Sequence, residues 1–208
     1  MAPHIPLIDT LRLIALGAGA ATMALSVATR HPVVQHYDDA LEEWMGTHRE
    51  RLHALASVAT LPGERFVHPV IAALSAAALW LSRGAPNSRF LLPLASASLG
   101  GIIAHHAVKF VYHRARPAIA LARLKTEAAF PSGHTTNATA VVATSAYLLA
   151  REGIIGAPVA VACVIAIAAA TGASRVALGW HWGSDVLGGW CAGLCVAALS
   201  GSWYEVLR

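Results

Sequence analysis

Long apolar stretches joined by short polar connections make up most of this chain. Apolar positions dominate six stretches, at residues 11-29, 66-82, 90-110, 135-150, 154-173 and 186-203. Stretches of this length are typical of helices, and a helix of about 20 residues is long enough to cross a bilayer. The pattern therefore predicts an all-α protein, an integral-membrane bundle of six transmembrane helices. Residues 52-61 either extend the second helix or form an interfacial segment.

A soluble all-helical protein is the alternative. Surface helices in water need a polar face, yet residues 154-173 carry no charged side chain, and Thr171 is the only uncharged polar one besides Cys163. The 208 residues have a mean hydropathy of +0.56, with 56% hydrophobic and only 12% charged residues, so the chain is far more apolar than an average soluble domain. Both observations favour the membrane bundle.

The polar part of the chain lies at residues 30-65, which we interpret as an amphipathic segment at the membrane interface. Trp44 lies among its charged residues, which include Asp38, Asp39, Glu42, Glu43, Arg49, Glu50, Arg51, Glu64 and Arg65. The preceding apolar stretch is too long for a signal-peptide core, and Arg30-His31-Pro32 follows where small residues would mark cleavage. We expect it to stay as a helix of a single domain that spans residues 1-208.

The net charge of +4 does not indicate a nucleic-acid partner, because the basic residues lie between apolar stretches and no nucleic-acid motif is present. The three cysteines, Cys163, Cys191 and Cys195, fall in apolar stretches. They are therefore expected to be small buried hydrophobes and not disulfide partners or metal ligands.

Three short motifs carry the candidate chemistry: Lys109-x6-Arg116-Pro117, Pro131-Ser132-Gly133-His134 and Ser174-Arg175-x5-His181-x3-Asp185. Lys and Arg side chains neutralise phosphate oxygens. The second motif immediately precedes an apolar stretch, and the N-terminus of a helix favours an anion. His181 and Asp185 are four residues apart, so on a helix they share a face and the carboxylate can orient the imidazole. Helix capping by Ser132 and a purely structural His-Asp pair are the alternatives.

The predicted topology gathers these motifs without further assumption. Successive membrane crossings alternate in direction, so the ends of the third and fifth helices and the starts of the fourth and sixth emerge on one face. All three motifs lie at those helix ends. We therefore expect a single phosphate site at one face of the bundle, where its cations do the work of a metal, and we expect no cofactor.

The three motifs in this order resemble those of the phosphatidic acid phosphatase type 2 superfamily, whose members include membrane lipid phosphate phosphatases, glucose-6-phosphatase and vanadium haloperoxidases. The resemblance covers Lys109 to Asp185 with no departure at the positions that carry chemistry. It implies that His181 attacks phosphorus, that Asp185 orients it, and that His134 protonates the leaving group and then activates water. The phosphate-binding residues are then Lys109, Arg116, Ser132, Gly133 and Arg175. His105, His106 and His113 have no motif position and are expected to be polar fillers or interfacial residues.

The resulting hypothesis is metal-independent dephosphorylation of a membrane lipid phosphate or pyrophosphate through a phosphohistidine. Undecaprenyl or another prenyl pyrophosphate ranks first, because residues 111-133 hold extra cations for a diphosphate, Arg114, Arg116, Arg123 and Lys125. A phosphatidylglycerophosphate or phosphatidic acid phosphatase and a lipid phosphotransferase are alternatives. Apolarity disfavours a vanadate haloperoxidase. A transporter is disfavoured because the ionisable residues collect at one set of helix ends.

The resemblance also implies a bacterial inner-membrane protein whose site faces the periplasm. Both termini would then lie on the opposite face, together with Arg12, Arg83, Arg89, Arg151 and Arg208. This distribution does not satisfy a simple positive-inside count. The sequence predicts no oligomeric state.

Overall fold

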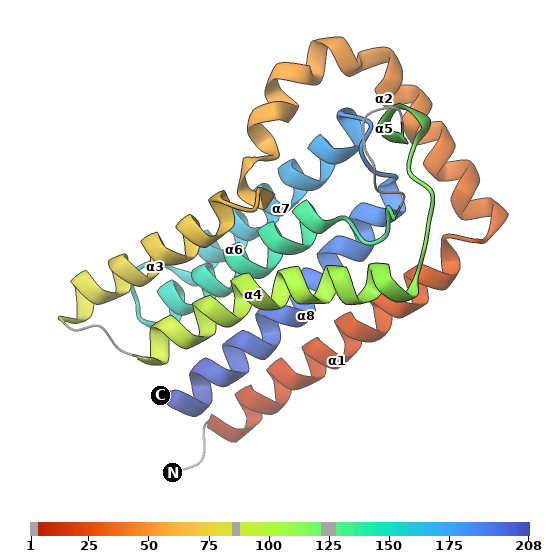
Figure 1. Ribbon diagram of the computed structural model, residues 1–208. Helices are drawn as coiled ribbons and strands as arrows, with labels where there is room; N and C mark the ends of the chain where they lie inside the picture. Colours follow the sequence, from red (N-terminus) through yellow and green to blue (C-terminus); the bar gives the residue numbers. More distant parts are fainter. Residues whose placement is uncertain (1–3, 85–87, 122–127) are drawn as a thin grey trace.

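The computed structural model describes residues 4–84, 88–121 and 128–208, and this part of the chain contains helices and no strand (Figure 1). Each predicted apolar stretch is a helix, with ends that differ from the prediction by one to seven residues. The helices that correspond to the six stretches are α1 (His4–Ala28), α3 (Val67–Arg83), α4 (Ser88–Val111), α6 (Gly133–Arg151), α7 (Ala157–Ala177) and α8 (Gly183–Leu207). They lie roughly side by side and form one bundle.

A further long helix, α2 (Pro32–Ala59), arches over one end of this bundle (Figure 1). The 3-10 turn η1 (Leu61–Gly63) separates it from α3, so residues 52-61 belong mostly to α2 and do not extend α3. The short helix α5 (Ala118–Leu121) lies beneath the arch. α2 packs against α7, α8 and η1, which places the polar part of the sequence over the end of the bundle.

Helix α6 is the central helix, because it packs against α3, α4, α7 and α8. Most of its residues are buried although many of them are polar. Thr136 donates to the carbonyl of Ser132 at 2.9 Å, and Thr144 donates to that of Ala140 at 2.8 Å, whereas the buried hydroxyl groups of Thr139 and Ser145 have no hydrogen-bond partner among the described residues. Surrounding helices thus shield from lipid a helix that is too polar to face it.

Glycines on α8 allow it to approach α6 closely. A methyl group added at Gly193 would lie 2.6 Å from the Thr139 side chain and 2.7 Å from the carbonyl oxygen of Thr136, and one added at Gly189 would meet Thr135 at 2.8 Å. These distances are shorter than van der Waals contact. This pair of glycines, one turn apart on α8, therefore serves close helix packing within the chain.

The outside of the bundle is apolar. Large apolar side chains are exposed on α1, α4 and α7, among them Leu13, Leu16, Ile103, Phe110 and Ile165. Among the residues that the structure describes, four helices are long and apolar enough to cross a membrane: α1 from Leu7, α4, α7 and α8. α3 is apolar but has only 17 residues, and α6 is too polar to qualify. The surface is that of an integral membrane protein, with four candidate spans by length and composition.

Both chain termini lie at the end of the bundle opposite α2 (Figure 1). Buried carboxylates at this end pair with the arginines predicted to share it: Glu152 lies 2.9 Å from Arg83, and Glu205 lies 2.7 Å from Arg151. Tyr204 also donates a hydrogen bond to Glu152. The helix ends that carry the three motifs are therefore at the other end, beneath α2.

Replacing Gly193 by Val should destabilise the protein by about 1–3 kcal/mol, because the added methyl groups overpack the contact between α6 and α8. The midpoint of thermal unfolding in detergent measures this effect. Gly17→Ala is the matched control, since nothing lies within 4 Å of a methyl group added at Gly17 on α1. Equal unfolding midpoints for the two variants would contradict the packing described for α8.

Candidate active site

A cleft of about 1310 Å³ opens at the end of the bundle beneath α2. Its walls come from α2, from the η1–α3 connection, from α4 and α7, and from the first residues of α6. Six of the eight site residues predicted from the sequence line it, namely Lys109, Arg116, Gly133, His134, Arg175 and His181. The predicted gathering of the motifs at one end is therefore found.

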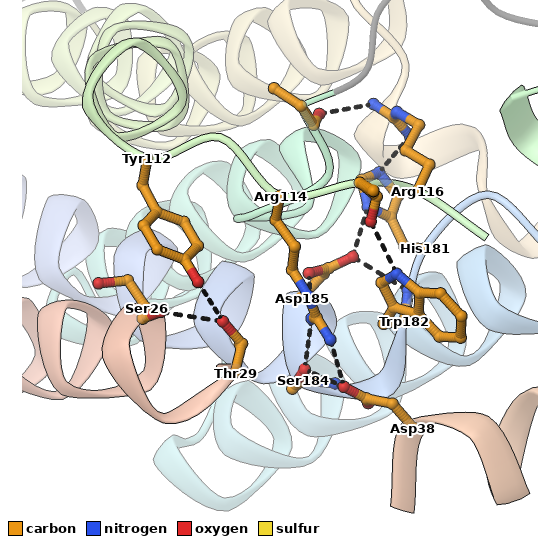
Figure 2. A network of polar contacts seen from close by, with 12 residues as sticks. Ser26, Thr29, Asp38, Tyr112, Arg114, Arg116, His181, Trp182, Ser184 and Asp185 are labelled. Carbon is orange, nitrogen blue, oxygen red and sulfur yellow. Dashed lines mark hydrogen bonds and ion pairs between the residues drawn. The ribbon is translucent and has the colours of Figure 1, made fainter. Parts of the chain in front are cut away.

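His181 lies in the connection between α7 and α8, and its side chain is almost fully buried at the floor of the cleft. Its Nδ1 is 3.3 Å from Oδ2 of Asp185, whose side chain is 0% exposed. Its Nε2 is 3.2 Å from Nη1 of Arg116 (Figure 2). With a proton on Nδ1 that is donated to the carboxylate, the ring has its lone pair on Nε2, on the side of the arginine.

The contact between His181 and Asp185 was predicted, but the reason given for it was wrong. His181 precedes α8, which begins at Gly183, so the two residues do not share a helix face. Asp185 is the third residue of α8 and accepts the backbone N–H of the capping residue, Trp182, at 3.0 Å. This capping geometry turns the carboxylate back toward His181.

Lys109, Arg116 and Arg175 form the cation cluster of the cleft. Lys109 is in the last turn of α4, Arg175 is in the last turn of α7, and Arg116 lies in the connection after α4. Arg116 donates to the carbonyl of Trp180 at 2.8 Å, and Arg175 donates to the hydroxyl of Thr60 at 2.8 Å. Within the described part of the chain, no hydrogen bond or ion pair engages the Lys109 ammonium.

These charges act on the nearby imidazole. Burial lowers the pKa of His181 well below its ordinary value, and Arg116, Arg175 and Lys109 lower it further. The ring is therefore neutral at neutral pH, which is the state in which Nε2 is a nucleophile. A neutral nucleophile next to cations that attract an anion is the arrangement that attack on a phosphate requires.

The N-terminus of α6 reaches the cleft through Gly133, not through Ser132. Ser132 is fully buried and does not line the cleft. Its backbone N–H donates to the carbonyl of Asp185 at 3.0 Å, its hydroxyl accepts from Thr135 at 3.0 Å, and its side chain makes no capping hydrogen bond. A direct contact between Ser132 and phosphate stays a prediction, whereas Gly133 is placed where an anion can reach it.

His134 has a partner that the sequence did not suggest. Its Nε2 is 3.0 Å from Oε1 of Glu64, and both residues line the cleft. The hydrogen bond from His134 holds the pKa of Glu64 below its ordinary value, against partial burial. A backbone contact explains the placement, because Gly63 packs against the main chain of His134, where a larger residue would clash. The only sequence feature that could have pointed to this contact is the acidic residue directly after Pro62-Gly63.

Two other histidines, which were expected to be polar fillers or interfacial residues, also line the cleft. His105 and His106 on α4 both line it, with ring centroids 4.2 Å apart. The buried His105 ring packs over Gly133, where an added methyl group would lie 3.1 Å away. His113 is exposed and does not line the cleft.

The interpretation of Arg114 as an extra cation for a diphosphate was wrong. Its guanidinium donates to Asp185 and to Asp38 of α2, at 2.7 Å in both cases, so it is engaged behind the cleft (Figure 2). Although burial alone would lower it, these two carboxylates raise the pKa of Arg114. Arg123 and Lys125, the other predicted cations, lie outside the described residues. Asp38 is a further residue that the sequence analysis did not single out.

Comparisons with known proteins agree with this geometry. The sequence model of the PAP2 superfamily matches residues 90–208, more than half of the chain. Undecaprenyl-diphosphatase BcrC of Bacillus subtilis (strain 168) is 29% identical over 141 residues, which cover 65% of this chain and 69% of the relative. The crystal structure of a transmembrane PAP2 type phosphatidylglycerolphosphate phosphatase from Bacillus subtilis superposes with a TM-score of 0.74 and 25% identity, over 93% of this chain and 97% of that one.

Replacing Glu64 by Gln should slow hydrolysis of esters with poor leaving groups. A carboxylate beside an imidazole favours the protonated ring that a general acid needs. We therefore expect kcat to fall roughly 10- to 100-fold for a long-chain alkyl phosphate but less than about threefold for p-nitrophenyl phosphate, whose leaving group needs no proton. The exposed Glu43→Gln on α2 is the control. Equal losses on both substrates would argue against a role of Glu64 in proton transfer.

Proposed function

Because the chain belongs to the PAP2 superfamily, we propose that it removes the terminal phosphate from a membrane lipid phosphate or pyrophosphate. The observation that carries the proposal is the placement of His181, with one imidazole nitrogen on Asp185 and the other beside the cation cluster. The related proteins act on undecaprenyl diphosphate and on phosphatidylglycerolphosphate according to their names. Both are lipids with a terminal phosphate.

In the first step, the lone pair on Nε2 of His181 attacks phosphorus while the bond between phosphorus and the leaving oxygen breaks. Arg116 moves its hydrogen bond from Nε2 to a phosphate oxygen, and Lys109 and Arg175 neutralise the remaining oxygens. His134 donates a proton to the leaving oxygen. The products of this step are the dephosphorylated lipid and a phosphohistidine, whose positive ring is stabilised by Asp185.

In the second step, His134, which is now neutral, takes a proton from water. The resulting hydroxide attacks phosphorus, the bond between phosphorus and Nε2 breaks, and inorganic phosphate leaves. Asp185 keeps the proton on Nδ1 throughout, so the lone pair returns to Nε2. Glu64 favours the protonated form of His134 with which the next cycle starts. We assign no metal to either step, since the cation cluster supplies the positive charge.

The position of the cleft favours a lipid. It lies at the end of an apolar bundle, and exposed apolar side chains such as Ile103 and Phe110 cover the outside of α4, one of its walls. A phosphate bound there leaves the rest of its molecule close to the acyl region, where each buried methylene contributes about 0.8 kcal/mol. Water-soluble esters do not gain this contribution.

A prenyl pyrophosphate such as undecaprenyl pyrophosphate is the substrate that we rank first. Arg114 no longer supports this ranking. Its support is the similarity to an undecaprenyl-diphosphatase, together with one further cation that lines the cleft, Arg65, whereas Arg49 is paired with Glu42 at 2.7 Å. Phosphatidylglycerophosphate and phosphatidic acid are the runners-up, the former because of the structural relative.

The chain is an integral membrane protein, and for its topology we propose six crossings, by α1, α3, α4, α6, α7 and α8, within a single domain of residues 1-208. The four apolar spans include the outer helices α1 and α7, and α3 and α6 run beside them in the same bundle. We further propose the bacterial inner membrane, with the cleft and α2 on the periplasmic side. Termini and cleft at opposite ends fit this arrangement.

Release of inorganic phosphate from a panel of substrates in mixed micelles tests the proposed function. We expect undecaprenyl pyrophosphate, phosphatidylglycerophosphate or phosphatidic acid to be hydrolysed with kcat/KM at least about 100-fold above that of glucose 6-phosphate, an advantage that burial of a few methylene groups provides. His181→Ala is the inactive control. Equal efficiency toward soluble and lipid phosphates would overturn the lipid assignment.

A further inference from the structure

The surface helix α2 contributes a buried charge to the back of the active site. Of the 28 residues of α2, all of which the structure describes, only Asp38 and Ala56 are buried. Asp38 is 5% exposed, whereas its neighbours Tyr37 and Asp39 are exposed. Burial of an unpaired carboxylate is costly, so this position needs an explanation in terms of its partners.

Those partners are Arg114 and the N-terminus of α8. Asp38 accepts the backbone N–H and the hydroxyl of Ser184, at 2.9 Å and 2.5 Å, and a guanidinium nitrogen of Arg114 at 2.7 Å. The other terminal nitrogen of Arg114 donates to Ser184 at 2.6 Å and to Asp185 at 2.7 Å. Figure 2 shows the resulting chain of contacts from Asp38 through Arg114 to Asp185 and His181.

We propose that Asp38 and Arg114 are positioning residues for the His181–Asp185 pair, so that α2 completes the active site and does not merely cover it. The inference rests on the proposed role of His181 as nucleophile. Arg114 fixes Oδ1 of Asp185, which leaves Oδ2 for the Nδ1–H of His181. Asp38 fixes Arg114 and, by accepting the Ser184 N–H, also fixes the first turn of α8, which carries Asp185.

The charges of this network set how strongly Asp185 supports His181. Arg114 is shared between two carboxylates, so its charge is only partly available to Asp185. When His181 becomes positively charged in the transition state, Asp185 therefore retains negative charge to stabilise it. Without Asp38, the full charge of Arg114 would act on Asp185 and oppose the positive ring. Without Arg114, Asp185 would be a buried carboxylate that has lost its cation.

Loss of the Asp38 charge and loss of the Arg114 charge shift the pH dependence of kcat in opposite directions. The active form needs a neutral His181 and an ionised Asp185, and both are lost through protonation at low pH. Removing the negative charge of Asp38 makes protonation of His181 and Asp185 harder, so the acidic limb of the pH–rate profile moves to lower pH. Removing the positive charge of Arg114 makes it easier, so the limb moves to higher pH. The other charged and titratable groups facing the pair are unchanged in both variants: Lys109 of α4, Arg116, His134 of α6 and Arg175 of α7.

The test compares Asp38→Asn and Arg114→Gln with wild type on the lipid phosphate that wild type hydrolyses best. We expect kcat to fall roughly 10- to 100-fold in both, with KM changed less than about threefold, because alignment and not binding is lost. The acidic limbs should move by about one pH unit in opposite directions. Arg114→Lys should recover part of the wild-type kcat, and its acidic limb should lie at the same pH as that of wild type. Asp39→Asn, the exposed neighbour, is the matched control and should behave as wild type.

Size-exclusion profiles and helical circular dichroism establish which variants are folded, and Arg114→Gln tests the coupling alone if Asp38→Asn does not fold. A readout independent of turnover is the titration of the His181 ring, followed by NMR in protein labelled at histidine. The midpoint of this titration should shift to lower pH in Asp38→Asn and to higher pH in Arg114→Gln. Wild-type kinetics and titration in Asp38→Asn, or shifts of the same sign in the two variants, would overturn the inference. A wild-type protein inactive on every lipid phosphate would contradict the proposed function, and the titration would still decide the coupling.

Discussion

Positive charge held away from water at one end of the bundle is the constraint to which the rest of the site responds. Lys109, Arg116 and Arg175 lie around the same cleft, and the hydrogen-bond partners of the two arginines are neutral carbonyl and hydroxyl oxygens and an imidazole nitrogen. Cations that are gathered in this way repel one another and are poorly solvated. An anion with several oxygens relieves both costs, so the cleft is organised for phosphate before any substrate arrives. Burial, reinforced by the same charges, lowers the pKa of His181 and keeps it neutral and therefore nucleophilic.

A polar site at the end of an apolar bundle requires a polar helix to carry it. α6 presents Gly133 and His134 at its first turn, and its threonines would be unfavourable against lipid. The bundle resolves this conflict by surrounding α6 with four other helices. Close approach of α8 at Gly189 and Gly193 then brings Asp185 within reach of the α6 N-terminus, where Ser132 donates to the Asp185 carbonyl. Packing deep in the bundle thus determines the geometry of the cleft.

The sequence allowed the bundle and the core of the site to be predicted, because both depend on local patterns. Apolar stretches located the six helices of the bundle, and motifs at helix ends placed Lys109, Arg175 and His181 at one face. The number of membrane crossings was harder to predict. The hydropathy of α6 is low for a membrane span, and hydropathy alone does not show that neighbouring helices enclose it. The cap of α8 was also missed. The four-residue spacing of His181 and Asp185 is typical of one helix, but α8 begins between these two residues, at Gly183.

Contacts between distant segments could not be predicted from one sequence. Glu64 is 70 residues from His134, and Asp38 is 146 residues from Ser184. Both carboxylates lie in a polar region where charged residues are common, so neither differs from its exposed neighbours in type or spacing. Arg114 was assigned to the substrate for the same reason: its charge is visible in the sequence, but the two carboxylates that engage it are not.

The central claim is that phosphorus is transferred to His181 before it reaches water. Rapid acid-free quenching of the His134→Ala protein with ³²P-labelled substrate tests this directly, since loss of the base slows hydrolysis of the intermediate and lets it accumulate. A good leaving group, such as p-nitrophenol, keeps the first step fast enough. We expect one acid-labile, base-stable label on the peptide that contains His181, and no label when His181 is also replaced by Ala. Turnover without any labelled protein, or a label on a different residue, would contradict it.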